Sequence, residues 1–346
     1  MSDTDIDTAE AYPYADLWIQ YALICKVRVL DIFCQDDAPH NIQLDVPLVS
    51  ERLTTLNLNQ VDLERCAALV DSKLSLDFSS CPLLKDLRMQ RCRICVHKIS
   101  SKSLERLRIT GLTSFNPLYR TARKNLHPRL RISAPSLISL VLGYFLEEAP
   151  VLESMPFLQK AFIKLHVGND CTCVGIKPGV QRCGDQSCER CYGYSTGSYQ
   201  SVLLNGLSNA IHLELIADPR VYIFRRDLAY CPIFGNLKTL LLNEWCVSNG
   251  LHGLVCILQH SPILEKLTLL FNTKNLPSAI GDDGNHDPIE QKFACVHLKV
   301  VDIKYQVMNQ RVSRTLKLLS TCGIPREHIR LKVCPSSPSS FSFEKQ

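Results

Sequence analysis

The stretch Leu237-Lys-Thr-Leu240-Leu-Leu242-Asn-Glu-Trp245 has the form L-x-x-L-x-L-x-x-hydrophobe, and near-copies of it recur along the chain. Successive copies begin roughly 20 to 34 residues apart, except for one step of about 52, and most of these spacings lie in or near the period of leucine-rich repeats. The other copies begin at Leu53, Leu84, Leu104, Leu137, Leu158, Ala210, Leu264 and Leu298. The motif therefore indicates a chain built from one repeated unit.

A short L-x-L strand places its two leucines on one face and the residue between them on the other. One such unit cannot bury its apolar face alone, so stacked units share a continuous core. The pattern predicts an α/β fold: a leucine-rich-repeat solenoid with a curved, mainly parallel sheet and with helices and loops on its convex side. The alternative, unrelated amphipathic strands in an ordinary α/β domain, is disfavoured because the motif recurs so often.

The composition is ordinary for a globular chain: of 346 residues, 46% are hydrophobic and 21% are charged, with a formal net charge of +5. Lys and Arg are scattered rather than gathered in basic runs, so no nucleic-acid partner is expected. The uncharged stretch from Trp245 to Leu264 is broken by His252, His260 and Pro262, so no membrane span is expected. The 17 cysteines and the acidic N-terminus, which lacks a secretion signal, predict free thiols in a reducing compartment, cytoplasmic and/or nuclear.

The spacing of the repeats divides the chain into segments. Residues 1–15 are expected to form a flexible acidic lead, residues 16–333 the repeat domain, and residues 334–346, rich in Pro and Ser, a disordered tail. Within the repeat domain, residues 166–201 are rich in Gly, Cys, Ser and Tyr and have no apolar period, which predicts a surface insertion. Residues 298–333 are expected to cap the C-terminal end.

Local patterns predict several individual elements. Prolines that precede repeats are expected to end a preceding helix before the chain enters its strand, because proline fixes φ and lacks an N–H donor. These are Pro82, Pro135, Pro156 and Pro262. The expected elements are a short amphipathic helix over 17–24, a first strand over 26–32, a helical stretch over 62–70, a helix over 312–320 and a closing strand over 328–333.

The sequence also contains five longer motifs that can be compared with those of known protein families. These are Trp18-Ile19-x-x-Ala22 before Val27-Arg-Val-Leu30, the repeats CPLLKDLRMQRC and SPILEKLTL, Leu298-Lys-Val-Val-Asp-Ile-Lys304, and Leu318-Leu-Ser-Thr-Cys-Gly-Ile-Pro325. Together they resemble plant F-box proteins with leucine-rich repeats, especially the divergent grass group with an FBD-like C-terminus. The resemblance covers roughly residues 16 to 333.

The resemblance implies the substrate-recognition part of an F-box-type SCF ubiquitin ligase receptor, with residues 298–333 as an FBD-like cap and a target protein on the concave face. Nothing in the short acidic stretch before this region resembles an F-box, so a Skp-type adaptor is expected as a partner only if an F-box lies upstream. The alternative is a stand-alone repeat scaffold, or a competitor that captures the same target without recruiting a ligase.

The residue between the two apolar positions of each L-x-L unit points outward on the expected concave face. Large apolar side chains often anchor interfaces, so Phe162 and Leu241 are the expected anchors. For any single position, a solvated or loop-covered side chain remains the alternative. The candidates for partner contact, basic early, apolar in the middle and acidic late, are Asn57, Arg88, Arg108, Val141, Phe162, Glu214, Leu241, Thr268 and Asp302.

The insertion holds the candidate metal ligands. Zinc takes about four thiolate or imidazole ligands, often as close pairs, and the C-x-x-C pair at Cys188 and Cys191 fits one such pair. The overall spacing matches no standard zinc finger, so a loop with reduced thiols and no cofactor is expected, with structural zinc as the alternative. The complete set of cysteines is Cys171, Cys173, Cys183, Cys188 and Cys191.

Catalytic motifs are lacking from the sequence. No P-loop, G-x-S-x-G, H-E-x-x-H or G-x-G-x-x-G pattern is present, and the histidines are scattered. The sequence therefore predicts a non-enzymatic protein-binding module.

Overall fold

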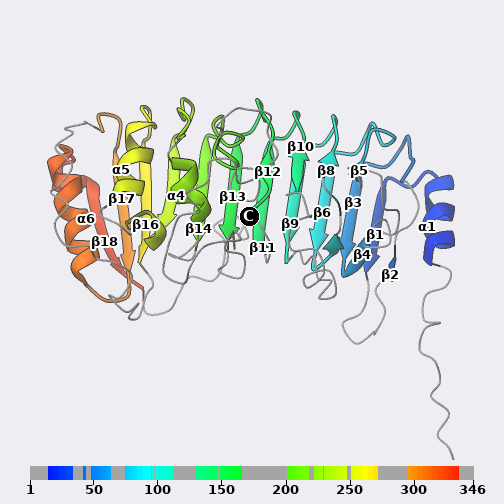
Figure 1. Ribbon diagram of the computed structural model, residues 1–346, viewed down its shortest axis with the longest axis horizontal. Helices are drawn as coiled ribbons and strands as arrows, with labels where there is room; N and C mark the ends of the chain where they lie inside the picture. The colour runs from blue at the N-terminus through cyan, green and yellow to red at the C-terminus, as the bar shows by residue number, and fades with distance from the viewer. Residues whose placement is uncertain are drawn as a thin grey trace, which may run out of the picture.

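The computed structural model of the protein describes residues 15–33, 42–43, 48–63, 75–94, 96, 98–111, 130–145, 149–165, 201–217, 222–228, 230–247, 251–271 and 295–334. These residues form an α/β fold around one eleven-stranded sheet. Figure 1 shows its strands side by side in an elongated row, from α1 (Ala15–Ile24) at one end to α6 (Gln310–Thr321) at the other. The expected α/β class with a large parallel sheet is confirmed.

The strands of this main sheet follow one another in chain order, and every neighbouring pair is parallel. They are β1 (Val29–Phe33), β3 (Thr55–Asn59), β6 (Asp86–Gln90), β9 (Arg106–Thr110), β11 (Ser139–Phe145), β13 (Lys160–Leu165), β14 (His212–Ala217), β15 (Thr239–Asn243), β16 (Lys266–Phe271), β17 (Val300–Tyr305) and β18 (Ile329–Val333).

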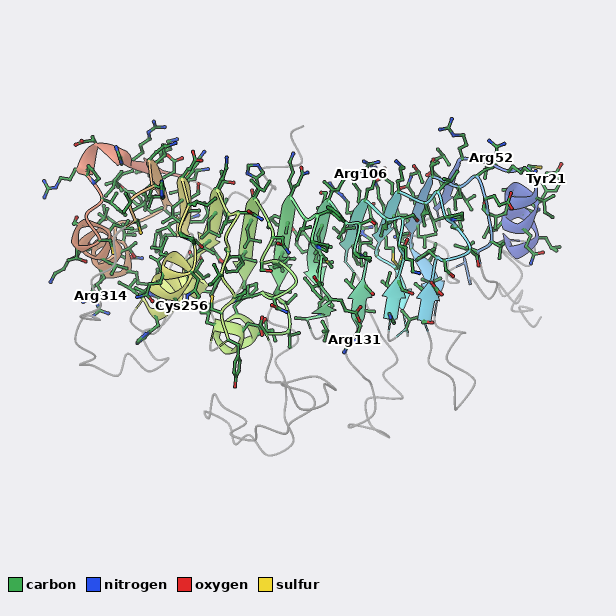
Figure 2. The ribbon with its side chains drawn as sticks, turned by 90° about the horizontal axis from the view of Figure 1, so that it is seen from above. Tyr21, Arg52, Arg106, Arg131, Cys256 and Arg314 are labelled. Atoms are coloured by element: carbon green, nitrogen blue, oxygen red, sulfur yellow. The ribbon has the colours of Figure 1, made fainter. Side chains whose placement is uncertain are left out.

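A second layer covers one face of the main sheet, as Figure 2 shows by placing Arg106 and Arg131 on opposite sides of the molecule. In the N-terminal half this layer holds short parallel strands, and in the C-terminal half it holds helices. The strands are β2 (Ile42–Gln43), β4 (Val61–Leu63), β5 (Ser75–Asp77), β7 (Arg93–Ile94), β8 (Lys98–Ser100), β10 (Arg131–Ser133) and β12 (Val151–Leu152). The remaining helices are α4 (Tyr222–Leu228), η4 (Glu244–Val247), α5 (His252–Gln259) and η5 (Arg326–His328).

The hydrophobic core lies between the two layers. Along β9 the side chains of Leu107 and Ile109 are buried, while Arg108 between them is half exposed. The second layer contributes Ile99 and Ile132 to the same cluster. Full burial of one such side chain stabilises the fold by about 1.5–3 kcal/mol, so each unit depends on both layers.

Trp245, which ends the motif quoted first, connects the layers near the C-terminal end. Its side chain is buried, and its Nε1 donates a hydrogen bond to the carbonyl oxygen of Leu215 at 3.0 Å. Its ring lies 4.7 Å, centroid to centroid, from that of Phe224 on α4. The final hydrophobic position of the motif therefore joins β14 to the helices in the C-terminal half of the second layer, which we call the helical layer.

A regular hydrogen-bond pattern aligns the starts of the strands. The carbonyl oxygen of Lys85 accepts from the amides of Glu105 (2.9 Å) and Arg106 (2.8 Å), and that of Glu105 accepts from Ile138 (2.8 Å) and Ser139 (3.0 Å). One carbonyl thus accepts two consecutive amides of the next unit. The carbonyls that do so are those of Arg28, Thr54, Lys85, Glu105, Ile138, Gln159, Ile211, Lys238 and Glu265.

The prolines before the repeats open turns. The amide of Leu84 donates to the carbonyl of Cys81 at 3.0 Å, and that of Leu137 donates to the carbonyl of Ala134 at 3.1 Å. Pro82 and Pro135 occupy the second position of these turns, which proline's fixed φ favours. The expectation that a helix precedes each proline is wrong at Pro82, Pro135 and Pro156, because the elements before them are the strands β5, β10 and β12. Only Pro262 follows a helix, α5.

The helix expected over 62–70 also needs correction. Residues 62 and 63 are part of strand β4, so the helix expected over 62–70 does not begin there, and residues 64–70 lie outside the described residues. Val61 and Leu63 are buried, and this alternation places both in the core, as a strand does. The expected helix 312–320 and closing strand 328–333 are confirmed as α6 and β18, and the strand expected over 26–32 is present as β1 but begins at Val29.

Helix α1 is present but is not amphipathic. One side packs on the core through Ile19, while the opposite side exposes Leu17, Trp18, Tyr21 and Ile24, and Trp18 is 77% exposed. The helix is therefore apolar on both sides. Among the described residues, no helix combines the length and apolarity that crossing a bilayer requires.

The long step between repeats does not interrupt the sheet. β13 and β14 pair directly, with Lys160 opposite His212 and Leu165 opposite Ala217, although residues 166–211 lie between them in the chain. Residues 166–200 of the predicted insertion lie outside the described residues. Ser201, the last residue of that prediction, is buried and already belongs to the packed unit.

Where the chain returns to the core, residues 201–204 contact one buried carboxylate, that of Asp227. Asp227 accepts hydrogen bonds from Ser201 Oγ (2.7 Å) and from the amides of Val202 (3.0 Å), Leu203 (2.6 Å) and Leu204 (3.0 Å). Because hydrogen bonds to a charged acceptor are stronger than neutral ones, Asp227 fixes residues 201–204 against α4.

Leu240→Ala is expected to lower the free energy of unfolding by about 2–5 kcal/mol, because it opens a cavity in the core. Leu241→Ala, one position along the same strand, removes a half-buried side chain from the other face and is expected to cost no more than about 1 kcal/mol. Urea unfolding of both variants measures the difference. Equal losses would contradict the assignment of the two faces.

Asp227→Asn is expected to lower the free energy of unfolding by at least about 2 kcal/mol, because the amide group opposes backbone donors with its own N–H. Asp77→Asn serves as the matched control. Asp77 also accepts from a nearby amide and hydroxyls, at Ser79 and Ser100, but it is exposed, so its loss is expected to stay below about 1 kcal/mol. Thermal unfolding followed by circular dichroism separates the two outcomes.

Candidate functional site

The outer face of the main sheet, defined as the face that points away from the second layer, carries the sequence-predicted candidates. All of them occupy the middle outward position of their strands, and the parallel register places them in one unbroken row. The structure extends this row at its two ends by Asp31 and Arg330. In order, the middle row is Asp31, Asn57, Arg88, Arg108, Val141, Phe162, Glu214, Leu241, Thr268, Asp302 and Arg330.

The members of the middle row differ in accessibility. Arg88 is exposed, whereas Asn57, Arg108, Val141 and Leu241 are half buried. Glu214, Thr268 and Asp302 are buried. These differences divide the row into an accessible N-terminal part and a more covered C-terminal part.

Phe162 does not fit the anchor role expected for it. Its side chain is only 1% exposed although its position points outward, so a partner cannot contact it without displacing its neighbours. Leu241 remains accessible as an apolar contact. Burial of a single outward side chain depends on its neighbours in space, which the repeat pattern does not encode.

Arg88 and Arg108 lie directly opposite each other on neighbouring strands. Among the described residues, neither arginine has an ion-pair partner. Like charges opposite each other on adjacent strands destabilise a sheet. This arrangement concentrates uncompensated positive charge at the accessible part of the middle row.

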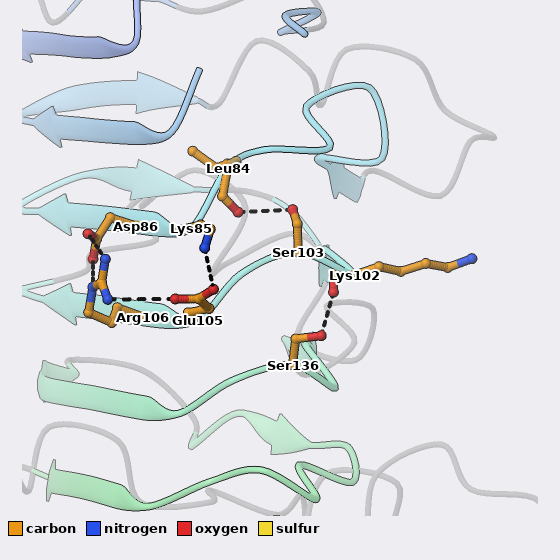
Figure 3. Close-up of polar contacts among 8 residues, drawn as sticks. All are labelled: Leu84, Lys85, Asp86, Lys102, Ser103, Glu105, Arg106 and Ser136. Carbon is orange, nitrogen blue, oxygen red and sulfur yellow. Dashed lines mark hydrogen bonds and ion pairs between the residues drawn. The ribbon is translucent and has the colours of Figure 1, made fainter. Parts of the chain in front are cut away.

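The charge of Arg106, which points outward two positions before Arg108 on β9, is neutralised. Arg106 donates two hydrogen bonds to the Asp86 carboxylate, at 2.7 Å from Nε and 2.6 Å from Nη2, and its Nη1 lies 3.7 Å from Glu105 (Figure 3). Lys85 pairs with the other oxygen of Glu105 at 2.8 Å. The hydrogen bond to Asp86 raises the pKa of Arg106 above its ordinary value. Arg106 is therefore engaged within the sheet, in contrast to Arg108.

The C-terminal end of the outer face is not acidic, contrary to the expectation from Asp302. Lys266 and Lys332 flank its carboxylate at 3.8 Å and 3.7 Å. Lys304 and Arg330 add positive charge without an ion-pair partner among the described residues. Strand β18, which closes the sheet, supplies two of these basic residues and changes the charge balance at this end.

On the outer face, basic residues outnumber acidic ones among the residues that the structure describes. The pKa of His212, at the start of β14, is lowered by burial and then by Lys160 and Lys238, which agrees with a positive surrounding. The acidic residues are Asp31, Asp86, Glu214 and Asp302. The basic ones are Arg88, Arg106, Arg108, Lys160, Lys164, Lys266, Lys304, Arg330 and Lys332.

A second cluster lies in the helical layer. The metal candidates Cys171, Cys173, Cys183, Cys188 and Cys191 lie outside the described residues. The structure instead brings together Cys231, Cys256 and His260, whose ligand atoms lie within 4.8 Å of one another. A hydrogen bond from the Cys231 thiol, with His260 nearby, lowers the pKa of Cys256 to about 7.

The sequence alone does not reveal this cluster, although it contains part of the signal. Cys256 and His260 are four residues apart on α5 and its C-cap, a spacing that places both on one helical face. Cys231 belongs to a different segment, and only the packing of α4 against α5 brings it close.

The chain is similar to a curated plant protein. The chain is 28% identical over 237 residues to the MEIOTIC F-BOX protein MOF of Oryza sativa subsp. japonica, a match that covers 65% of this chain and 46% of that protein. The chain thus spans about half the length of this relative. No family model matches the chain, and no solved structure matches it. The likeness supports a distant relationship to plant F-box proteins.

Arg108→Gln is expected to leave the free energy of unfolding unchanged or to raise it by about 0.2–1 kcal/mol, because it removes repulsion from Arg88. Arg106→Gln, two positions earlier on β9, loses the Asp86 pair and is expected to lower it by up to about 1 kcal/mol. The contrast should shrink at high salt, which screens exposed charges. Urea unfolding at low and high salt checks this, and equal destabilisation by both variants would contradict it.

Proposed function

We propose that this chain is a leucine-rich-repeat solenoid that binds a target protein on the outer face of its main sheet, the expected concave face. The observation that carries the proposal is the aligned middle row, in which the accessible arginines Arg88 and Arg108 lie opposite each other and have no acidic partner within the described part of the chain. An arrangement that costs stability in the free protein is favourable when a partner supplies the missing negative charge.

The charge of the outer face indicates the chemistry of the partner. An acidic segment of a target protein would neutralise Arg88 and Arg108 near one end and Lys304 and Arg330 near the other. Leu241, between these two basic parts, offers an apolar contact. Electrostatic complementarity of this kind raises the association rate and selects among partners.

We further propose that the chain is the substrate-recognition part of an F-box-type SCF ubiquitin ligase receptor and does no chemistry of its own. The relationship to a rice F-box protein supports this role, and so do the repeat motifs of the sequence. Recruitment to the ligase would require an F-box that docks on a Skp-type adaptor. Without one, the chain would capture its target as a scaffold or competitor.

The experiment is affinity purification of the tagged chain from its source tissue, followed by quantitative mass spectrometry. The double variant Arg88→Glu with Arg108→Glu is expected to lose at least about 90% of the captured target, a tenfold change that corresponds to about 1.4 kcal/mol. Charge reversal places negative charge opposite the acidic partner.

The control changes charge by the same amount away from the outer face. Lys102→Glu with Lys317→Glu alters two exposed lysines on a loop and on α6, and capture of the target should be unchanged. A target that is retained by the outer-face variant would refute the assignment of this face.

The ligase role is tested by two further measurements. Sequencing the transcript upstream of Met1 shows whether an F-box lies in frame, and co-purification of a Skp-type adaptor with the full-length product is then expected. Capture of the target without the adaptor, from a transcript that lacks an F-box, would leave the scaffold or competitor role.

A further inference from the structure

Cys231, Cys256 and His260 come from two neighbouring units of the helical layer. Cys231 follows α4, where its amide donates to the carbonyl of Leu228 at 3.3 Å. Cys256 lies on α5, and His260 is the C-cap of that helix. The amide of Phe234 donates to the carbonyl of His260 at 2.8 Å and holds the connection after Cys231 against the end of α5.

The distances within this cluster suit a common metal ligand set. The Sγ atom of Cys256 lies 3.9 Å from Nδ1 of His260, and the ligand atoms of all three residues lie within 4.8 Å of one another. In a tetrahedral zinc site, bonds of about 2.3 Å to sulfur and 2.0 Å to nitrogen place neighbouring ligands roughly 3.5 to 3.8 Å apart. A contraction of about 1 Å or less would therefore complete the geometry.

We propose that Cys231, Cys256 and His260 bind a zinc-class divalent metal ion, which cross-links the α4 and α5 units of the helical layer. Two thiolates and one imidazole are the ligand types that zinc prefers. Three side chains leave a fourth position of the tetrahedron, which a water molecule can fill. All three residues are half buried, so an ion can enter while much of the solvent is excluded.

The hydrogen bonds around His260 show which contact metal binding would replace. Nδ1 lies 2.8 Å from the carbonyl oxygen of Cys256, which can only accept, so Nδ1 carries the hydrogen in the metal-free protein. The ion would take the place of this hydrogen once the imidazole ring turns Nδ1 away from the carbonyl oxygen. The carbonyl of Cys256 keeps the amide of His260 as a donor at 3.1 Å, so no buried acceptor is left without a partner.

Two thiolates balance the charge of a divalent ion. Nearby Asp227 adds a negative field at Cys231 without being a ligand, because its oxygens already accept from Ser201 and the amides of residues 202–204. A site of this charge favours cations over anions. It also disfavours the hard ions magnesium and calcium, which prefer oxygen ligands.

The metal site is independent of the proposed target-binding face. Figure 2 shows Cys256 among the helices, on the side of the molecule opposite Arg106. Loss of metal binding should therefore leave the charge of the outer face unchanged, and substitutions at Arg88 and Arg108 should leave metal binding unchanged.

The test uses the full chain, reduced and freed of metal, titrated with Co²⁺ as a spectroscopic probe and then with Zn²⁺. The expected result is one ion per chain, with sulfur-to-cobalt charge-transfer absorption for two thiolates that zinc removes. Cys231→Ser with Cys256→Ser should abolish the signal, and His260→Ala should weaken affinity at least about tenfold.

The control replaces the cysteines of the predicted insertion by serine, at Cys171, Cys173, Cys183, Cys188 and Cys191. This variant should bind the ion as the natural chain does. Loss of binding here, with binding retained in Cys231→Ser with Cys256→Ser, would overturn the proposal. So would an absence of binding by the folded natural chain.

Alkylation of the natural chain gives an answer that does not depend on folding of a variant. Zinc should slow the modification of Cys231 and Cys256 by iodoacetamide at least about tenfold, as followed by mass spectrometry, and should leave exposed Cys25 unaffected. Equal rates with and without zinc would overturn the proposal, as would a Cys231–Cys256 disulfide that forms equally fast in the presence of zinc.

Discussion

From β3 to β17, each strand start in the main sheet is held by one carbonyl oxygen of the preceding unit, which accepts hydrogen bonds from two consecutive amides. These shared acceptors fix the register of neighbouring strands, and a register shift by one residue would move every buried leucine to the outer face. The continuous core and the aligned outward rows both follow from this constraint. Without it, Arg88 and Arg108 would not lie opposite each other.

The same constraint explains how the chain passes its longest connection without losing order. β13 and β14 keep the shared acceptor at Gln159 although residues 166–211 separate them in the chain. Asp227 then holds residues 201–204 in place as the chain returns to the core. The shared backbone acceptors and the buried carboxylate of Asp227 together keep the two strands paired, whatever the number of residues that connects them.

The repeat motif was sufficient to predict the main sheet and its outward row, because each L-x-L unit determines the direction of three side chains at once. It predicted helices and loops on the other face of the sheet, but the N-terminal half of that layer holds strands such as β5 and β10, which are too short to show a period. It also could not predict that Phe162 is buried or that β18 reverses the charge around Asp302, since both depend on neighbours in space. Cys231 joins Cys256 and His260 only through packing of distant segments.

The turns that open at Pro82 and Pro135 lie before the strands β6 and β11, outside the bonds that set the register. Insertions and deletions in the connections that lead to these turns therefore leave the framework intact, and substitutions on the outer face leave the core intact. Selection can act on the two sets of positions separately. A gene with this architecture can vary the outer surface of its product through many small changes, each of which keeps a folded protein.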